Sequence, residues 1–218
     1  LDLKFPHHEN EIAQCEVCNN THLANIWVHN GMININGIKM SKSLGNVWWA
    51  KDLIENHGGN LTRWLMISTH YRAPLNLNEE AFTTSKKELD KIAAAYKQAC
   101  VKLALSSAQE ATTFDETYTA FMDALNDDLN TPNAISVVYE VVKKINQVVR
   151  QREIDVENLS VLVHTLEKML YILGIEFEKI TMSEEDKEMY QNWRNAVKEK
   201  DFETADTLRQ TLIEKGIL

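Results

Sequence analysis

The sequence predicts a mainly α-helical protein, in which a short strand-containing segment is followed by a helical bundle and a small helical unit at the C-terminus. Apolar residues recur at spacings of three and four from about residue 79 to the end of the chain. Patterns typical of strands are confined to the residues before about position 40. With 218 residues, 44% of them hydrophobic, the chain is long enough for two or three compact units.

The composition excludes several classes of protein. A net charge of −9 argues against a protein that coats nucleic acid indiscriminately, because such binding comes from neutralising phosphates. We expect a cytoplasmic protein with no membrane association, because no apolar run approaches a bilayer span and no signal peptide opens the chain. Three cysteines are too few for a disulfide framework, so we expect reduced thiols.

The first predicted element contains a dense ionisable cluster, Pro-His-His-Glu-Asn-Glu at residues 6–11. Proline favours the first helical position, and the sequence predicts a helix over about residues 6–17. His7 and Glu11 are then an i, i+4 pair about 6 Å apart along the axis, a separation that one metal ion can bridge. The alternative is an acidic first turn that complements the helix dipole. Residues 1–5 look like the end of a strand, so we expect the sequence to begin inside a longer protein.

Strands and a polar loop follow. Residues 26–28 have strand character, and residues 32–40 alternate around Asn-Gly, which predicts a hairpin. The hairpin leads into the loop at residues 39–46, Lys-Met-Ser-Lys-Ser-Leu-Gly-Asn. Two lysines with small hydroxyl residues between them can fold over a triphosphate and stabilise the charge that grows on its oxygens. The alternative is a solvated surface loop with two ordinary lysines.

The remaining chain is predicted to be helical. Two helices begin near residues 52–54 and 61–65, and the pattern breaks at residues 70–74. Four apolar stripes that need each other for burial then predict a bundle. The stripes are Leu89, Ile92, Tyr96, Cys100 and Leu103; Phe114, Tyr118, Phe121 and Leu125; Ile135, Val138, Val142, Ile145 and Val149; and Leu159, Leu162, Leu166, Leu170 and Leu173. Gly174 ends the last helix. A capping box at Ser183 then starts a unit of two short helices.

Several blocks of the sequence resemble one enzyme family. The pentapeptide Lys-Met-Ser-Lys-Ser at residues 39–43 resembles the signature loop of class I aminoacyl-tRNA synthetases. Further blocks look like the cysteinyl-tRNA synthetase family, in the right order and spacing. The matching blocks are residues 5–14, 27–32, 39–46, 70–76 and 123–132, with a less specific likeness at 205–209 and 215–217.

The resemblance implies a set of site residues and ligands. Lys39 and Lys42 would be catalytic and would bind ATP together with Ser41 and Ser43, with Mg²⁺ accompanying the nucleotide. One Zn²⁺ per full-length chain would be held by His7 and Glu11 with two cysteines expected upstream of Leu1. In the family this zinc binds the thiolate of the substrate, a bond that a serine hydroxyl cannot form equally well.

The resemblance also implies a domain organisation. Residues 1–35 would end an α/β nucleotide-binding catalytic domain, and residues 36–80 would form a tRNA stem-contact segment with the lysine loop. Residues 81–178 would be a DALR-like, tRNA-binding helical bundle, and residues 183–218 a small anticodon-side domain. The expected partners are tRNA(Cys), ATP and L-cysteine, and the expected state is a monomer. The family's two cysteine ligands, its His-Ile-Gly-His type motif and most of its nucleotide-binding sheet would precede Leu1, so we expect the 218 residues alone to be inactive.

Alternatives to a cysteine--tRNA ligase remain open. One is a ligase that transfers cysteine to an amino-sugar in a thiol biosynthesis pathway, although the helices after Ser183 count against it. Another is a non-catalytic, zinc-bearing helical RNA-binding module. Cys15, Cys18 and His22 could form a structural zinc knuckle or a surface turn with two free thiols. A basic stretch could touch tRNA phosphates or be a solvated face. Its residues are Lys143, Lys144, Arg150 and Arg152.

Overall fold

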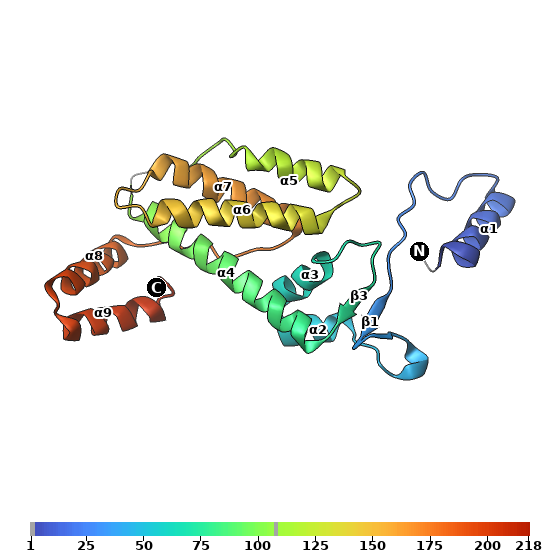
Figure 1. Ribbon diagram of the computed structural model, residues 1–218, viewed down its shortest axis with the longest axis horizontal. Helices are drawn as coiled ribbons and strands as arrows, with labels where there is room; N and C mark the ends of the chain where they lie inside the picture. The colour runs from blue at the N-terminus through green and yellow to red at the C-terminus, as the bar shows by residue number, and fades with distance from the viewer. Residues whose placement is uncertain (1–2, 107–108) are drawn as a thin grey trace. The chain divides into compact units, whose positions relative to one another are not determined.

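The computed structural model describes residues 3–106 and 109–218 (Figure 1). The chain forms two compact units. Unit 1 consists of Leu1–Lys87 and Ala124–Pro132, and unit 2 of Glu88–Asp123 and Asn133–Leu218. Helices dominate and the strands are few, so the predicted mainly α-helical fold is confirmed. None of the helices in the described ranges is both long and apolar enough to cross a bilayer.

The predicted N-terminal helix is present and begins irregularly. A short π-type turn, η1 (Lys4–His8), contains the extended residue Phe5 and leads into α1 (Glu9–Asn19). The prediction that residues 1–5 end a strand is wrong for residues 4 and 5, which belong to η1. Leu1 and Asp2 lie outside the described residues. All described side chains of α1 are at least partly exposed. The helix is therefore a solvent-accessible element of unit 1.

A three-stranded sheet organises unit 1. Strands β1 (Ile33–Ile35) and β2 (Ile38–Lys39) form the predicted antiparallel hairpin, and Asn36 and Gly37 both adopt positive φ as its turn requires. Strand β3 (Leu75–Leu77) pairs with β1 in parallel and gives the order β2-β1-β3. The predicted strand at residues 26–28 is wrong. The described part of the chain offers it no ladder partner, and Ile26 is 83% exposed.

Two helices cover the sheet. These are α2 (Ala50–His57) and α3 (Gly59–Ile67), which begin close to the predicted positions and are separated at Gly58. Leu53 of α2 and Leu65 of α3 are buried with Ile35 and Leu77 of the sheet in one apolar cluster. This shared core fixes the strands against the helices, and so determines where the segments that leave the sheet begin.

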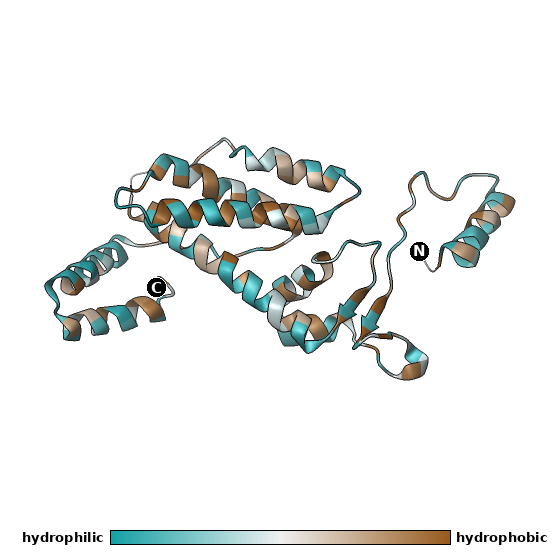
Figure 2. Ribbon diagram, in the orientation of Figure 1, coloured by the Kyte–Doolittle hydropathy of each residue, from teal (hydrophilic) through white to brown (hydrophobic). Residues whose placement is uncertain are grey.

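Unit 2 contains the predicted bundle. It is built from α4 (Glu79–Ala104, from residue 88 onward), α5 (Thr117–Asn126), α6 (Thr131–Val149) and α7 (Val156–Leu173). Most residues of the predicted stripes are buried, and Ile92, Phe121, Ile145 and Leu159 have no exposed surface. Apolar residues recur along α6 and α7 (brown in Figure 2). Phe114 differs from the prediction, because it precedes α5 and is 40% exposed.

The last two helices form a hairpin, α8 (Glu184–Glu199) and α9 (Phe202–Glu214). The predicted capping box at Ser183 is confirmed, since its hydroxyl accepts from the amide of Asp186 (3.1 Å) and the Asp186 carboxylate accepts from the amide of Ser183 (3.0 Å). The surface of α8 is largely hydrophilic (Figure 2). Its buried face, with Tyr190, joins Leu212 and Val101 in a small apolar cluster. The hairpin therefore packs on α4 within unit 2.

Candidate functional site

Three segments of unit 1 leave the sheet at the same end. Because β1 and β3 are parallel, the residues before them lie together, and the Leu75 amide donates to the Met32 carbonyl (3.0 Å). Because β1 and β2 are antiparallel, β2 ends beside the start of β1, and the Met40 amide donates to the Ile33 carbonyl (3.0 Å). The sheet topology therefore gathers residues 29–32, 41–46 and 70–74, which belong to three of the family-like blocks.

The lysine loop is folded back on itself. Asn46 closes its base, since its side chain accepts from the Ser41 amide (2.9 Å) and donates to the Lys39 carbonyl (3.2 Å). Within the loop, η2 (Lys42–Leu44) is a 3₁₀ turn capped by the Ser41 hydroxyl, which also lies 3.2 Å from the Ser43 hydroxyl. Ser41, Lys42 and Ser43 thus lie on one turn, and Lys39 ends the strand that leads into it.

The charged groups of this loop face solvent. Lys39, Lys42 and Ser43 are exposed, and Ser41 is half-buried. The Lys42 ammonium lies 6.0 Å from the centre of the Trp49 ring, at the outer limit of a cation–π contact. Two ammonium groups and two hydroxyls within five consecutive residues are a set of groups that can bind a polyphosphate from solution. The described structure contains no acidic partner for either ammonium among its ion pairs.

Residues 70–73 approach residues 29–31 very closely. The Gly31 amide donates to the Tyr71 carbonyl (2.6 Å), and a Cβ atom at Gly31 would lie 2.3 Å from the Ala73 carbonyl oxygen. Only glycine fits at this position without a shift of backbone. The side chains of Tyr71 and Arg72 contact Asp128, which belongs to the same unit although it lies 56 residues further along the chain.

The histidine-rich start of the chain lies beside residues 27–29. His8 and His29 are joined Nδ1 to Nδ1 at 2.8 Å, and their rings stack with centroids 4.9 Å apart. Removal from water is the main cause that lowers the pKa of His29, and the charges of His8, Lys4 and Arg72 add to the effect. His29 is thus favoured as a neutral ring. His29 lies in the family-like block at residues 27–32, and the sequence alone indicates no role for it.

The residues predicted to bind zinc, His7 and Glu11, would make only part of a ligand set. His7 and Glu11 are both exposed and lie one helical turn apart on the same continuous helical stretch. Across residues 3–106 and 109–218, no three His, Cys, Asp or Glu side chains come close enough to hold a metal ion together. Catalytic zinc takes three protein ligands and structural zinc four. An imidazole and a carboxylate are donor types that zinc accepts, so a zinc ion held by His7 and Glu11 would need further ligands from outside the described residues.

The other metal motif does not assemble. Cys18 is exposed, Cys15 is half-buried, and both are free thiols. The His22 ring lies 3.0 Å from the Glu16 carboxylate instead of turning toward a thiol. The geometry of the described residues therefore favours a surface turn with two free thiols.

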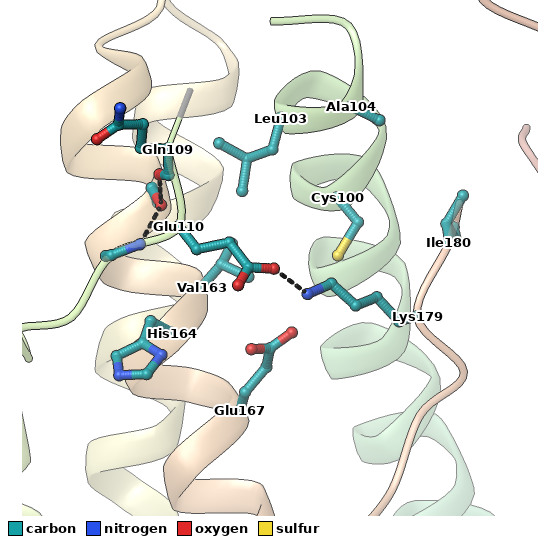
Figure 3. A pocket seen from close by; sticks show the side chains of 12 residues that line it. Cys100, Leu103, Ala104, Gln109, Glu110, Val163, His164, Glu167, Lys179 and Ile180 are labelled. Atoms are coloured by element: carbon teal, nitrogen blue, oxygen red, sulfur yellow. Dashed lines mark hydrogen bonds and ion pairs between the residues drawn. The ribbon is translucent and has the colours of Figure 1, made fainter. Parts of the chain in front are cut away.

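Two features of unit 2 bear on RNA and ligand binding. Lys144 of the basic stretch is held by Asp115 (2.9 Å) and Glu116 (3.2 Å), so it is not available for a phosphate. A cavity of about 290 Å³ opens between α4, α7 and the connector after α7 (Figure 3). The side chains that point into it include Cys100, Glu167 and the Lys179–Glu110 ion pair. Burial raises the pKa of the Cys100 thiol, so that group is a poor nucleophile.

Comparison with known proteins matches two parts of the chain to domain families. Residues 1–87 match the family of tRNA synthetases class I (C) catalytic domains, and residues 120–178 match the DALR domain family. A cysteine--tRNA ligase of Bacillus cereus (strain B4264) is 38% identical over 226 residues, covering 100% of this chain and 48% of the relative. The ligase of Oceanobacillus iheyensis is 37% identical, with 100% and 48% covered.

A third relative is equally similar. The cysteine--tRNA ligase of Mycoplasma mycoides subsp. mycoides SC is 37% identical over 222 residues, covering 100% of this chain and 49% of the relative. The chain thus spans about half the length of the curated relatives that it matches. The resemblance drawn from the sequence blocks is confirmed. The chain matches the class I (C) catalytic and DALR domain families, and over its whole length it is similar to a C-terminal portion of cysteine--tRNA ligases.

Proposed function

We propose that the chain is the C-terminal part of a cysteine--tRNA ligase, which uses ATP to form cysteinyl-adenylate and transfers cysteine to tRNA(Cys). The observation that carries the proposal is the meeting of three family-like blocks at one end of the sheet, with the lysine loop exposed there. The names of the relatives agree with this activity.

The loop would stabilise charge during adenylate formation. The cysteine carboxylate attacks the α-phosphate, the bond to the bridging oxygen breaks, and pyrophosphate leaves with the electron pair. Lys39 and Lys42, with the hydroxyls of Ser41 and Ser43, would bind the phosphate oxygens on which negative charge increases. The attacking carboxylate is already ionised, so this step needs no general base. ATP would be bound with Mg²⁺, which reduces the charge repulsion between the phosphates.

His7 and Glu11 would hold the zinc ion together with ligands from outside the described residues. Zinc supplies a site for a thiolate and so distinguishes cysteine from serine without a separate editing step. The i, i+4 spacing puts the imidazole and the carboxylate on one helix face, so both would be able to bind the same ion.

The helical parts would bind the tRNA. We assign residues 36–80 to the stem-contact segment, 81–178 to the bundle and 183–218 to the anticodon side. The α8–α9 hairpin has its own capping box and a small apolar core, as expected of a unit that can be added to the catalytic half. A cytoplasmic location fits this role, because tRNA charging takes place where translation does. We also propose that the protein is a monomer.

The test uses the complete product of the gene, read from its own initiation codon. Cysteine should support ATP–pyrophosphate exchange, serine should support it far less, and tRNA(Cys) should be charged. Exchange without tRNA charging, together with transfer of cysteine to an amino-sugar, would identify the sugar ligase instead. Absence of ATP–pyrophosphate exchange in a folded, zinc-loaded protein would contradict the proposed ligase activity and favour a non-catalytic RNA-binding module.

A further inference from the structure

Asp128 and residues 70–72 form a compact cluster of side chains in unit 1. The Asp128 carboxylate accepts from the Arg72 guanidinium through Nε (2.6 Å) and Nη2 (3.0 Å), and from the Tyr71 hydroxyl (2.6 Å). The His70 ring lies 3.9 Å from the same carboxylate and stacks on the Tyr71 ring. One acid thus organises three consecutive side chains of the 70–74 segment.

The backbone that carries this carboxylate has an unusual conformation. Asp128 and the next residue, Leu129, both have a φ of 54°, in the left-handed region that residues other than glycine rarely occupy. The turn is held from α5 by bonds from the amides of Leu129 to Leu125 (3.0 Å) and of Asn130 to Ala124 (3.1 Å). Two such residues in succession, where one is a bulky leucine, indicate a conformation maintained by its surroundings and often found at functional sites.

Arg72 is fixed in place and still has donors to spare. The two-pronged bond to Asp128 uses two of the five N–H donors of a guanidinium, and the Tyr71 hydroxyl also interacts with the guanidinium, so the donors are not all taken up by Asp128. The guanidinium also lies over the Tyr71 ring, 5.3 Å from its centre. Half of the Arg72 side chain (49%) and of the Asp128 side chain (46%) is exposed, so the remaining edge of the guanidinium can be reached from solvent.

The segment that carries Arg72 leaves the sheet at the same end as the segment that leads into the exposed lysine loop. A planar, pre-oriented guanidinium matches the geometry of phosphate oxygens and loses little conformational entropy on binding. The charges of Arg72 and Asp128 balance each other, so the affinity of this pair for a phosphate would come from the free donors of the guanidinium.

We propose that Arg72 binds a phosphate group of a substrate at this end of the sheet and that Asp128 is the positioning residue that orients it. The inference deepens the proposed function and rests on it. The phosphate has two sources in that reaction, the triphosphate of ATP and a phosphodiester of the tRNA. Both present the same oxygens to the guanidinium, so binding measurements must distinguish them.

The experiment measures binding by the 218-residue chain itself. The probes are inorganic tripolyphosphate and a tRNA(Cys) transcript, each titrated at several salt concentrations. The variants are Arg72→Ala, Arg72→Lys and Asp128→Asn, with Lys51→Ala as the matched control. Lys51 is a cation of the same unit that pairs with Glu55 on the surface of α2. Asparagine tolerates the left-handed region, so Asp128→Asn should keep the turn. Circular dichroism establishes that each variant is folded.

The proposal predicts a loss confined to the Arg72 and Asp128 variants. Arg72→Ala should weaken binding of one probe about eightfold at 0.1 M salt and reduce its salt slope by roughly 0.9, as expected for one phosphate contact. Loss with tRNA alone identifies a phosphodiester, and loss with tripolyphosphate identifies the nucleotide. Arg72→Lys should restore only part of the affinity, because it keeps the charge and lacks the fork.

The role of Asp128 is tested by non-additivity. Asp128→Asn should weaken the same probe, and the double variant with Arg72→Ala should be no weaker than Arg72→Ala alone. Fully additive losses would contradict the positioning role. Unchanged affinity of a folded Arg72→Ala chain for both probes, or full rescue by lysine, would overturn the assignment of Arg72. Failure of wild type to prefer tRNA(Cys) over other tRNAs would instead count against the proposed function, and the tripolyphosphate measurement would still test Arg72.

Discussion

Replacing Gly31 by alanine should separate two segments that the candidate site needs side by side. A Cβ atom at this position would lie 2.3 Å from the Ala73 carbonyl oxygen, 2.5 Å from its carbon and 3.0 Å from the Pro74 nitrogen. All three atoms are backbone, so no change of rotamer can relieve the contact. To reach 3.4 Å, where ordinary van der Waals contact begins, the segments must move apart by about 1.1 Å.

That movement determines the size of the effect. The bond from the Gly31 amide to the Tyr71 carbonyl is 2.6 Å long and would lengthen beyond hydrogen-bonding range. Loss of one hydrogen bond costs about 0.5–1.5 kcal/mol, and a forced expansion of packed atoms costs about 1–3 kcal/mol. We therefore expect Gly31→Ala to lower the free energy of unfolding by about 2–4 kcal/mol. A displacement of 1 Å near reacting groups can also reduce the rate about 100-fold.

Urea unfolding followed by tryptophan fluorescence measures the stability, and ATP–pyrophosphate exchange by the complete gene product measures the rate. Gly59→Ala is the control. Gly59 begins α3 and has no atom within 4 Å of the added Cβ, so this change should leave stability equal or raise it by about 0.5–1 kcal/mol. Equal stabilities of the two alanine variants would refute the close approach of residues 31 and 73.

Four further predictions concern other parts of the chain. Lys42→Ala should reduce cysteine-dependent pyrophosphate exchange about 100-fold or more, with little change in cysteine binding. His7→Ala should lower the zinc content of the complete protein, and a double variant with Glu11→Ala should lower it further. The bond from Lys215 lowers the pKa of Asp186 to about 2. The stabilisation by the ionised Asp186 carboxylate is therefore present above about pH 4 and lost as the pH falls toward 2. Hydrogen exchange of the α8 amides should show this loss of protection, and Asp186→Asn should abolish its pH dependence. Deletion of residues 183–218 should spare exchange and raise the KM for tRNA.

Each of these predictions has an outcome that contradicts it. An unchanged exchange rate in Lys42→Ala would remove the catalytic role of the loop, and Lys51→Ala provides the matched loss of one exposed lysine. Zinc that persists in the His7 and Glu11 variants and disappears with Cys15→Ser would favour the knuckle. An α8 protection profile with the same pH dependence in Asp186→Asn would assign the acid sensitivity to another carboxylate. Equal loss of pyrophosphate exchange and of tRNA charging on deletion of residues 183–218 would indicate that the α8–α9 hairpin has only a structural role.

Helices could be predicted because their signals are local. The stripes that contain Ile145 and Leu159 recur within one helix, and each buries the face that the spacing predicted. Gly174 ends α7 in the left-handed conformation, and Ser183 caps α8, as the sequence indicated. Phe114 satisfied the same spacing and lies outside α5, because periodicity does not identify where a helix begins.

Strands were harder to predict because their stability comes from partners elsewhere in the chain. Strand β3 has three residues, and its partner β1 lies about forty residues earlier, so no local pattern marks the pairing. Residues 26–28 had the composition of a strand and form none, because the described structure offers them no ladder partner. The hairpin of β1 and β2 was predictable because its Asn36-Gly37 turn is specific and adjacent.

The candidate site shows the same division between local and distant information. The i, i+4 pair of His7 and Glu11 and the lysine loop are contained in short segments, so chemistry and spacing sufficed to select them. The cluster on Asp128 depends on a contact across 56 residues. Both of its segments belong to family-like blocks, but no sequence pattern indicated that the two blocks meet. Since residues 124–132 belong to unit 1, a chain that ended before residue 124 would keep the sheet and the loop and would lose the carboxylate that orients Arg72. The helical part of the chain therefore contributes a residue to the first unit's site, and the boundary of that site does not follow the order of the sequence.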